Sequence, residues 1–335
     1  MHKAAIVILN YNGRDMLKRF LPSVTACSTY DIVVVDNASS DGSMTYLEEN
    51  YPQVDRVFLT INSGYSGGYN EGLDKLKGRY DYYLLLNSDV KVSPFWDLGM
   101  IDFLDKNPNI AVAQPKIISL SDEVSFDYAG ASGGYLDTIG YPYCRGRILH
   151  SLEKDEGQYD LPISVDWASG ACFCVRAEEF HLNGGFDPVF FAHMEEIDLC
   201  WRLRNRGYQI FANPKVTVYH LGGGTLNRSH PQKTYLNFRN SLFMLYKNLS
   251  RTKFHKLLFF RFVLDSGAMI HLLFTLGPAH SFAVIRAYFG FFSQRHFLTT
   301  YPHSGGNNIT SRSPIVFSII WEYYGKGKKY FSQLP

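Results

Sequence analysis

The feature that most constrains the fold is an alternation of short apolar runs with helical patterns over the first third of the chain. Runs rich in β-branched and aliphatic residues have the length of single strands, and stretches of helical periodicity separate them; the runs span 4–11, 31–36, 56–62, 80–89 and 110–119. Strands that alternate with helices in this way are typical of βαβ units, whose right-handed crossovers produce a parallel sheet. The sequence therefore predicts an α/β fold with a mostly parallel central sheet and flanking helices.

Composition sets limits on the class of protein. The chain has 335 residues, 46% of them hydrophobic, which is enough for one large domain with an appendage or for two modest domains. A formal net charge of +2 lacks the basic excess of a general nucleic-acid-binding protein, so nucleic acid is not an expected partner. The five cysteines are scattered along the sequence, and we expect them to be buried, reduced thiols. The first residues lack a signal-peptide pattern, and we expect a cytoplasmic protein.

Polar residues gather where four of the predicted strands end. The clusters are Asn10, Tyr11 and Asn12; Asp36 and Asn37; Asn62; and Asn87, Ser88 and Asp89. Any one cluster is explained by a turn or a helix cap, since Asn and Asp favour both. Together they indicate a ligand site, because the carboxyl ends of parallel strands lie at one edge of the sheet.

The end of the apolar run 80–89 suits a divalent cation. Asp89 with a nearby polar partner fits Mg²⁺ or Mn²⁺, which are hard cations that accept few protein ligands and keep positions for phosphate oxygens. The glycine-rich segment 62–72 would let a ligand approach the backbone, although it matches neither a Walker loop nor the usual dinucleotide fingerprint. His220 ends a predicted strand at 216–220, and its spacing leaves a structural role and a metal-ligand role equally open.

Three acidic residues crowd the start of a predicted helix in "HMEEIDLCWRLRNRGY". Glu195, Glu196 and Asp198 all fall in its first turn. The simple interpretation is that they complement the positive end of the helix dipole. Three carboxylates in four positions exceed what capping needs, and their mutual repulsion should raise at least one pKa, which suits a general base.

Several motifs, taken together and in order, resemble those of the inverting glycosyltransferases of family 2, specifically the rhamnosyltransferase-like branch that builds bacterial surface polysaccharides. The motifs are "VILNYNG", "VVVDNASSDGS", "NSGYSGGYNEG", "LLLNSDV", "SGACFCVR", "GGFDPVFFAHMEEIDLCWR", "VYHLGGGT" and "YLNFRNSLFML". Each motif is modest evidence by itself, but all of them in the same order are specific. The resemblance extends from about Ala4 to Leu249.

The resemblance implies a GT-A fold, in which a Rossmann-like nucleotide-sugar half at about 1–120 joins an acceptor half at about 121–230. A C-terminal helical region at 231–335 would follow this catalytic domain. By similarity, eight polar residues would surround the nucleotide sugar: Asn10, Tyr11, Asp36, Asn37, Asn62, Asn70, Asn87 and Ser88.

The same resemblance implies roles for the metal ligands, the acceptor side and the base. "NSD" stands where the family has its D-x-D-type motif, so Asp89 would be the principal metal ligand, and His220 matches a histidine that binds the metal in relatives. Trp167 and Gly170 would lie beside the acceptor. The second acid of the family's E-D-x-D-L-x-x-R pattern is the base; that position is Glu196 here, where Asp is usual, with Glu195 and Asp198 as alternatives.

The implied activity is metal-dependent transfer of a sugar from a UDP-, dTDP- or GDP-linked donor to a hydroxyl of a glycan or lipid-linked acceptor, with inversion. A nucleotidyltransferase is the competing enzyme class, but its usual Gly-rich, Lys- or Arg-bearing loop is poorly matched by "NYNGRD", which has only Arg14. A catalytically inactive carbohydrate-binding relative is the other alternative, and the presence of Asp89, Glu196 and His220 argues against it.

The segment Ser266–Ile285 contains no Asp, Glu, Lys or Arg, so a transmembrane helix has to be considered. Gly277-Pro278 interrupts it, and helices that lie on a membrane surface or pack on the domain fit better. The basic tail at 326–329 would strengthen contact with anionic lipid at the cytoplasmic face of the inner membrane. An ordinary helical appendage or a homo-oligomer interface is equally compatible with this segment.

Overall fold

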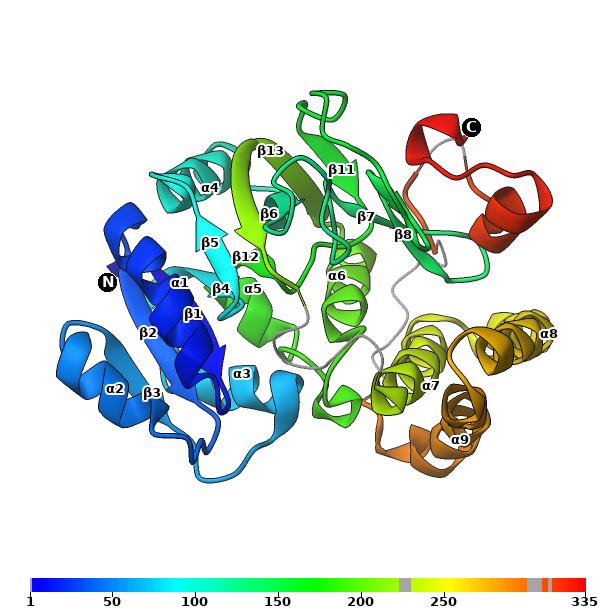
Figure 1. The fold of residues 1–335 in the computed structure, drawn as a ribbon, viewed down its shortest axis with the longest axis horizontal. Helices are drawn as coiled ribbons and strands as arrows, with labels where there is room; N and C mark the ends of the chain where they lie inside the picture. The colour runs from blue at the N-terminus through cyan, green and yellow to red at the C-terminus, as the bar shows by residue number, and fades with distance from the viewer. Residues whose placement is uncertain (1, 223–229, 300–308, 313–314) are drawn as a thin grey trace.

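The computed structural model describes residues 2–222, 230–299, 309–312 and 315–335. Its centre is a nine-stranded sheet with the order β11-β13-β6-β12-β4-β1-β2-β3, and β5 pairs with β13 (Figure 1). Alternate residues of the central strand β4 (Tyr80–Leu86) belong to two separate core clusters. Helices therefore cover both faces of the sheet, which confirms the predicted α/β fold.

The N-terminal half is the parallel part of the sheet. β1 (His2–Asn10) pairs in parallel with β2 (Asp31–Asp36) and with β4, and β2 pairs in parallel with β3 (Asp55–Phe58). The connecting helices are α1 (Arg14–Cys27), α2 (Ser43–Asn50) and α3 (Gly64–Asp74). α1 buries Leu17, Phe20, Leu21 and Val24, the spacing of one helix face. This arrangement places the carboxyl ends of β1, β2 and β4 at one edge, as the sequence predicts.

The second half of the sheet is mixed. It contains β5 (Val90–Val92), β6 (Ile110–Ser119), β11 (Ile163–Val165), β12 (Cys172–Arg176) and β13 (Gln209–His220), with α4 (Trp96–Lys106), α5 (Ala177–Leu182) and α6 (Glu195–Asn205). β12 runs antiparallel to both β4 and β6, whereas β13 runs parallel to β6.

One strand prediction was wrong. The runs 209–214 and 216–220 read as two strands, but they form the single strand β13. Its pairing with β6 shifts register between Asn213 and Thr217. An irregularity of this kind bends a strand without ending it, because the ladder resumes beyond the inserted residues.

Between β6 and β11 the chain forms a smaller antiparallel sheet. Its strands are β7 (Gly134–Leu136), β8 (Pro142–Cys144), β9 (Arg147–Ile148) and β10 (Ser151–Leu152). The C-terminal segment packs on it, and Phe331 stacks against Tyr135 with ring centroids 5.7 Å apart. Part of the region predicted as helical from 231 to 335 is therefore a strap across the smaller sheet, with short turns at Trp321–Gly325 and Phe331–Gln333.

Three helices follow β13: α7 (Pro231–Asn248), α8 (Arg251–Thr275) and α9 (Pro278–Gln294). α8 and α9 lie at the opposite side of the molecule from α2 (Figure 1). The predicted break at Gly277-Pro278 separates them. By length and composition α8 is apolar enough to cross a membrane, and only 11% of its most apolar window is buried. The last three residues of the motif "VYHLGGGT", 223–225, lie outside the described residues.

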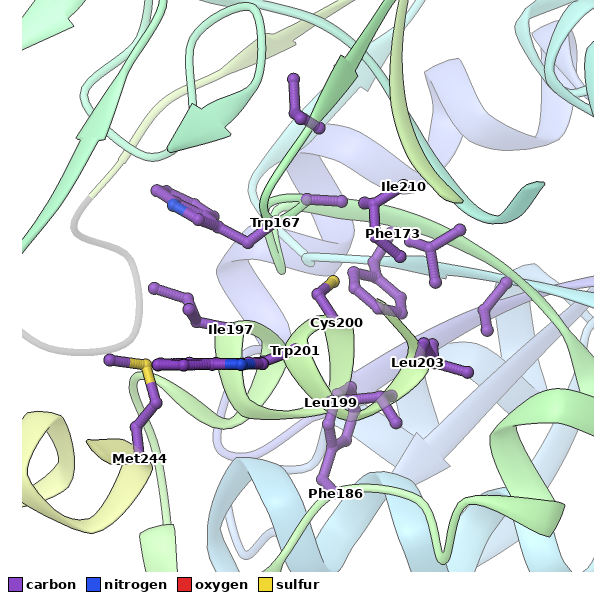
Figure 2. Packing of buried hydrophobic residues seen from close by; sticks show 14 of the residues in the cluster. Trp167, Phe173, Phe186, Ile197, Leu199, Cys200, Trp201, Leu203, Ile210 and Met244 are labelled. Carbon is purple, nitrogen blue, oxygen red and sulfur yellow. The ribbon is translucent and has the colours of Figure 1, made fainter. Parts of the chain in front are cut away.

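The core behind the site is continuous from the sheet to α7. Figure 2 shows Leu199, Trp201 and Leu203 of α6 among Phe173, Phe186 and Met244, all members of one buried cluster. All five cysteines are free thiols, and four of them are buried, in agreement with the expectation of buried thiols. The packing fixes α6, so the acidic residues at its start are presented by a rigid element.

Candidate active site

Three of the predicted polar strand ends are joined by side-chain hydrogen bonds. The Asn10 amide, at the end of β1, donates to Asp36 Oδ1 at the end of β2 over 3.3 Å. The Asn37 amide donates to Asn62 Oδ1 over 2.9 Å. Asn10, Asp36 and Asn37 are buried, whereas Asn62 is exposed and the Tyr11 side chain is 47% exposed. The buried three shape this edge of the sheet, and Tyr11 and Asn62 are the residues open to a ligand.

The glycine-rich segment holds the start of α3 against the loop before α6. The Phe191 carbonyl accepts hydrogen bonds from the amides of Tyr65 and Ser66, at 2.7 and 3.1 Å. A Cβ on Gly64, whose φ is +75°, would lie 2.5 Å from the Phe191 ring. Asn70 makes two hydrogen bonds to the backbone of Phe186. Asn70 therefore fastens α3 to this loop, a structural role that the sequence did not indicate.

Asp89 and His220 lie side by side because of strand pairing. β5 begins directly after Asp89 and pairs antiparallel with the end of β13, so that His220 stands opposite Val90. His220 Nε2 lies 3.2 Å from Asp89 Oδ1, and both side chains are buried. The structure thus brings together two residues that the sequence separates by more than a hundred positions.

This pair fits a hard or borderline divalent cation. Two ligand atoms about 2.1 Å from one ion and at right angles to each other lie about 3 Å apart, close to the observed separation. Carboxylate oxygen and imidazole nitrogen are both ligands that Mn²⁺ accepts. Among the described residues, no group of three or more His, Cys, Asp or Glu side chains could hold a metal ion. Asp89 and His220 would therefore share the ion with diphosphate oxygens and water.

Asp127 orients His220 from the opposite side of the ring. Its Oδ1 lies 2.9 Å from His220 Nδ1, and it is buried in the loop after β6. Burial alone would lower the pKa of His220, but the hydrogen bonds to Asp127 and Asp89 outweigh it and raise the pKa to about 9. A carboxylate on the far nitrogen of a metal-binding histidine fixes the tautomer and directs the other nitrogen at the ion.

The rest of the "NSD" segment lies next to the segment that contains Gly170. The backbone N–H of Asn87 donates to the backbone carbonyl of Ala171 over 3.0 Å. The side chains of Asn87 and Ser88 are partly exposed. The hydroxyl of Tyr65 donates to the carbonyl of Gly170 over 2.9 Å. Gly170 and Ala171 therefore connect the glycine-rich segment to the "NSD" segment.

Trp167 is held in place from two sides. Its indole Nε1 donates to the Tyr135 carbonyl over 3.1 Å. A Cβ on Gly134 would meet the Trp167 ring, so only glycine permits this packing. Trp167 is buried, and it supports the segment that leads to Gly170.

Two glutamates at the start of α6 have buried carboxylate oxygens without hydrogen-bond partners, Glu195 Oε2 and Glu196 Oε2. Burial raises the pKa of Glu196 to about 7. Burial, followed by repulsion from Glu196, raises the pKa of Glu195 further, and only 4% of its side chain is exposed. Glu196 is partly exposed, so it combines access with a pKa near neutral, the properties of a general base.

Asp198 is occupied in a buried ion-pair network. It accepts hydrogen bonds from Arg202, Lys247 and Asn248, at 2.8–2.9 Å. Burial alone would raise the pKa of Asp198, but Lys247 and Arg202 hold it below its usual value. The geometry therefore favours Glu196 over Asp198 as the base.

The loop that leads into α6 is conformationally strained. Phe191, His193 and Met194 have φ between 65° and 72°, a region that side-chain-bearing residues adopt only when the surroundings enforce it. The buried amide of Asn240 on α7 donates to the carbonyls of Phe190, Ala192 and His193 at 2.8–2.9 Å. α7 thereby holds the loop that presents Glu195 and Glu196.

Sequence reasoning missed three residues of this arrangement: Asp127, Arg239 and Asn240. Arg239 donates to the carbonyls of Val189 and Phe190. The adjacent pair Arg239 and Asn240 lies in the motif "YLNFRNSLFML", which carries the family resemblance but has no chemical signature of its own. Asp127 had no signal, because its partner His220 is 93 positions away.

The mixed central sheet, covered by helices on both faces, with polar residues at the strand ends of one edge, corresponds to the GT-A fold of glycosyltransferases. Known structures support the fold. The chain is similar to GalNAc-T7 solved with UDP, GalNAc and Mn²⁺, with a TM-score of 0.56 and 17% identity over 76% of this chain and 49% of that one. It is also similar to Staphylococcus aureus TarS 1-349, with a TM-score of 0.54 and 14% identity over 88% of this chain and 80% of that one.

Sequence comparison supports the same class of enzyme. The glycosyl transferase family 2 model matches residues 5–166. An N-acetylglucosaminyl-diphospho-decaprenol L-rhamnosyltransferase from Mycobacterium tuberculosis is 25% identical over 69% of this chain and 82% of its own length. Rhamnosyltransferase WbbL from Escherichia coli is 25% identical over 64% of this chain and 82% of its own length. The family model and these relatives support a family 2 glycosyltransferase with a rhamnosyltransferase-like sequence, in agreement with the resemblance found in the motifs.

Proposed function

We propose that the protein moves a sugar from a nucleotide diphosphate sugar to a hydroxyl of a glycan or lipid-linked acceptor in bacterial surface polysaccharide synthesis, with a divalent cation and with inversion. The observation that carries this proposal is the buried Asp89–His220 pair at the strand ends. Two relatives are named as rhamnosyltransferases, which makes L-rhamnose the first sugar to test. The name of one of them contains a decaprenol-linked saccharide, which supports a lipid-linked acceptor.

The positions of the candidate site residues suggest separate roles in binding the donor, the cation and the acceptor. Tyr11 and Asn62 are exposed at the donor edge and would contact the nucleotide, while Asn10, Asp36 and Asn37 keep that edge in shape. Asp89 and His220 would hold Mn²⁺ or Mg²⁺, which supplies Lewis-acid neutralisation of the diphosphate charge. Trp167 and Gly170 would border the acceptor, and Asn87 and Ser88 would lie between donor and acceptor.

Glu196 carries the proton transfer in this proposal. Its carboxylate takes the proton of the acceptor hydroxyl as that oxygen forms a bond to the anomeric carbon. The bond from the anomeric carbon to the diphosphate oxygen breaks, and its electron pair leaves with the nucleotide diphosphate. Attack and departure on opposite faces invert the anomeric centre through an oxocarbenium-like transition state. Since the unpartnered Glu196 oxygen is buried, little water competes with the acceptor for the base.

Thermal unfolding with combinations of cation and nucleotide tests the donor half of the proposal. We expect one of UDP, dTDP or GDP to raise the melting temperature only when Mn²⁺ or Mg²⁺ is present, because a ligand that binds the native state stabilises it by mass action. Asp89→Ala should abolish this response. Asp81→Ala, which removes an exposed carboxylate at the other end of the same strand region, should preserve it.

The two results separate the alternatives. Loss of the response in Asp89→Ala alone supports a metal–diphosphate site at Asp89. If no nucleotide stabilises the wild-type protein with either cation, the proposed donor site is wrong, and the polar strand ends are structural.

A further inference from the structure

We infer that α8 and α9 form a docking surface for an anionic lipid bilayer, on which the protein lies without crossing it. This surface, the α8–α9 face, consists of the exposed aromatic residues of the two helices. Its principal members are Phe259, Phe262, Phe274, Phe282, Phe289 and Phe292, and each is about half exposed or more. Phe274, next to the turn between the helices, is 82% exposed.

The exposed aromatic residues are contiguous and not scattered. Phe259, Phe262, Phe289 and Phe292 line one apolar cavity of ≈ 600 Å³ between the two helices. Soluble proteins rarely expose large contiguous apolar surfaces, and those that do use them for binding. An open apolar groove of this size has room for lipid acyl chains.

A buried polar cluster fixes which side of α8 faces outward. Arg261 and Asp265 are buried. Asp265 accepts hydrogen bonds from the hydroxyls of Tyr141 and Tyr288, at 2.6 and 2.8 Å, and Arg261 donates to Ser241 Oγ over 2.8 Å. Insertion of α8 as a span would break these contacts and move both charges into hydrocarbon, which is costly. The helix therefore stays on the protein, with its apolar side outward.

Charge identifies the partner as anionic lipid. Between 251 and 299 the sequence has six Lys and Arg residues and a single acid, Asp265, and that acid is the buried one. Lys256 and Arg286 are exposed beside the aromatic residues. Apolar residues bordered by basic ones match the interface of a membrane that contains acidic headgroups. A second copy of this face would bring like charges together, which disfavours self-association.

Vesicle flotation tests the inference without donor or acceptor, so its failure is distinguishable from failure of the proposed transferase activity. The full chain is mixed with vesicles of phosphatidylethanolamine and phosphatidylglycerol, or of phosphatidylcholine alone. We expect the wild type to float with the anionic vesicles. The triple variant Phe259→Ser, Phe274→Ser, Phe289→Ser should lose at least about tenfold in partitioning.

Matched variants control for folding and for charge. The triple variant Val124→Ser, Leu161→Ser, Leu182→Ser removes an equal number of exposed apolar side chains elsewhere and should float like the wild type. Lys256→Glu with Arg286→Glu should weaken binding to anionic vesicles more than to phosphatidylcholine. Unchanged melting temperatures show that each variant is folded.

Two results would overturn the inference. One is a folded wild type that does not float with anionic vesicles. The other is a wild-type dimer in sedimentation velocity that the Phe259, Phe274 and Phe289 substitutions convert to a monomer, because the α8–α9 face would then bind a second copy of the chain.

Discussion

Replacing Glu196 with Gln should stabilise the protein while it removes activity. Burial raises the pKa of Glu196 from its usual value of 4.5 to about 7, so ionisation at high pH works against folding. For a fully buried group, this difference between the two pKa values would lower the free energy of unfolding by about 3 kcal/mol at high pH. Because Glu196 is partly exposed, we expect a gain of about 2–3 kcal/mol in the free energy of unfolding. For 335 residues, this raises the melting temperature by roughly 3–4 °C.

The pH dependence of this gain identifies its cause. Below the unfolded-state pKa of 4.5, Glu196 is protonated in both states and resembles Gln. Between that value and about 7 the unfolded state loses its proton while the folded state keeps it, so the wild type loses stability as pH rises. The gap between Glu196→Gln and wild type should therefore widen from about pH 5 to about pH 8 and then stay constant. Thermal unfolding across that range measures it.

The transferase activity of Glu196→Gln tests the proposed role of Glu196 as the base. Loss of a general base lowers kcat by about 10²–10⁴, and the wild-type rate should rise with pH up to about 7 as Glu196 ionises. Glu48→Gln, on the exposed surface of α2, is the control and should change neither property. The reasoning fails if Glu196→Gln keeps its activity, or if its stability gain is the same at about pH 5 and about pH 8. Inactivity of Glu195→Gln together with an active Glu196→Gln would move the base to Glu195.

Three further predictions follow from the contacts around the site. Asp127→Ala should weaken Mn²⁺ binding to the free protein by about 10–100-fold, because His220 loses its orienting carboxylate; titration followed by electron paramagnetic resonance measures this. Asn240→Ala should lower kcat with little change in the Kd of the nucleotide, since it releases the strained loop before α6, and Asn240→Asp should not restore the rate because a carboxylate cannot donate. Lys247→Met should lower the free energy of unfolding by about 3–5 kcal/mol, measured by denaturant titration, because Asp198 loses a buried partner.

The fold was largely predictable because its signals are local. Each parallel strand in the first half is a short apolar run, and the polar residues at its end follow directly in sequence. The antiparallel placement of β12 between β4 and β6 was not predictable, since strand order depends on packing across the sheet. The continuity of β13 was missed for a related reason: Pro214 reads as the end of a strand, whereas pairing with β6 carries the strand through the irregularity between Asn213 and Thr217.

The candidate site was likewise predictable only where the sequence carries a local signal. Asp89, His220 and the acidic start of α6 were found because their residue types carry chemistry. The supporting contacts were not found, because Asp127 and Asn240 act through partners far away in sequence, and their residue types are common in loops and helices. Asn10, Asn37 and Asn70 are predicted to contact the donor, and the structure shows their side chains in hydrogen bonds within the protein; their contact with the donor stays a prediction.

The contacts of α7 bear on where the catalytic domain ends. A boundary at 230 assigns α7 to the C-terminal region, yet Lys247 and Asn248 bind Asp198 of α6, and Asn240 holds the loop that presents Glu196. A catalytic unit without α7 would leave buried Asp198 without Lys247, one of its two cationic partners, and the loop before α6 without the support of Asn240. α7 therefore belongs with the catalytic unit. α8 joins this unit through the Arg261–Asp265 cluster and through Phe254, whose ring centroid lies 5.2 Å from that of Tyr246 on α7.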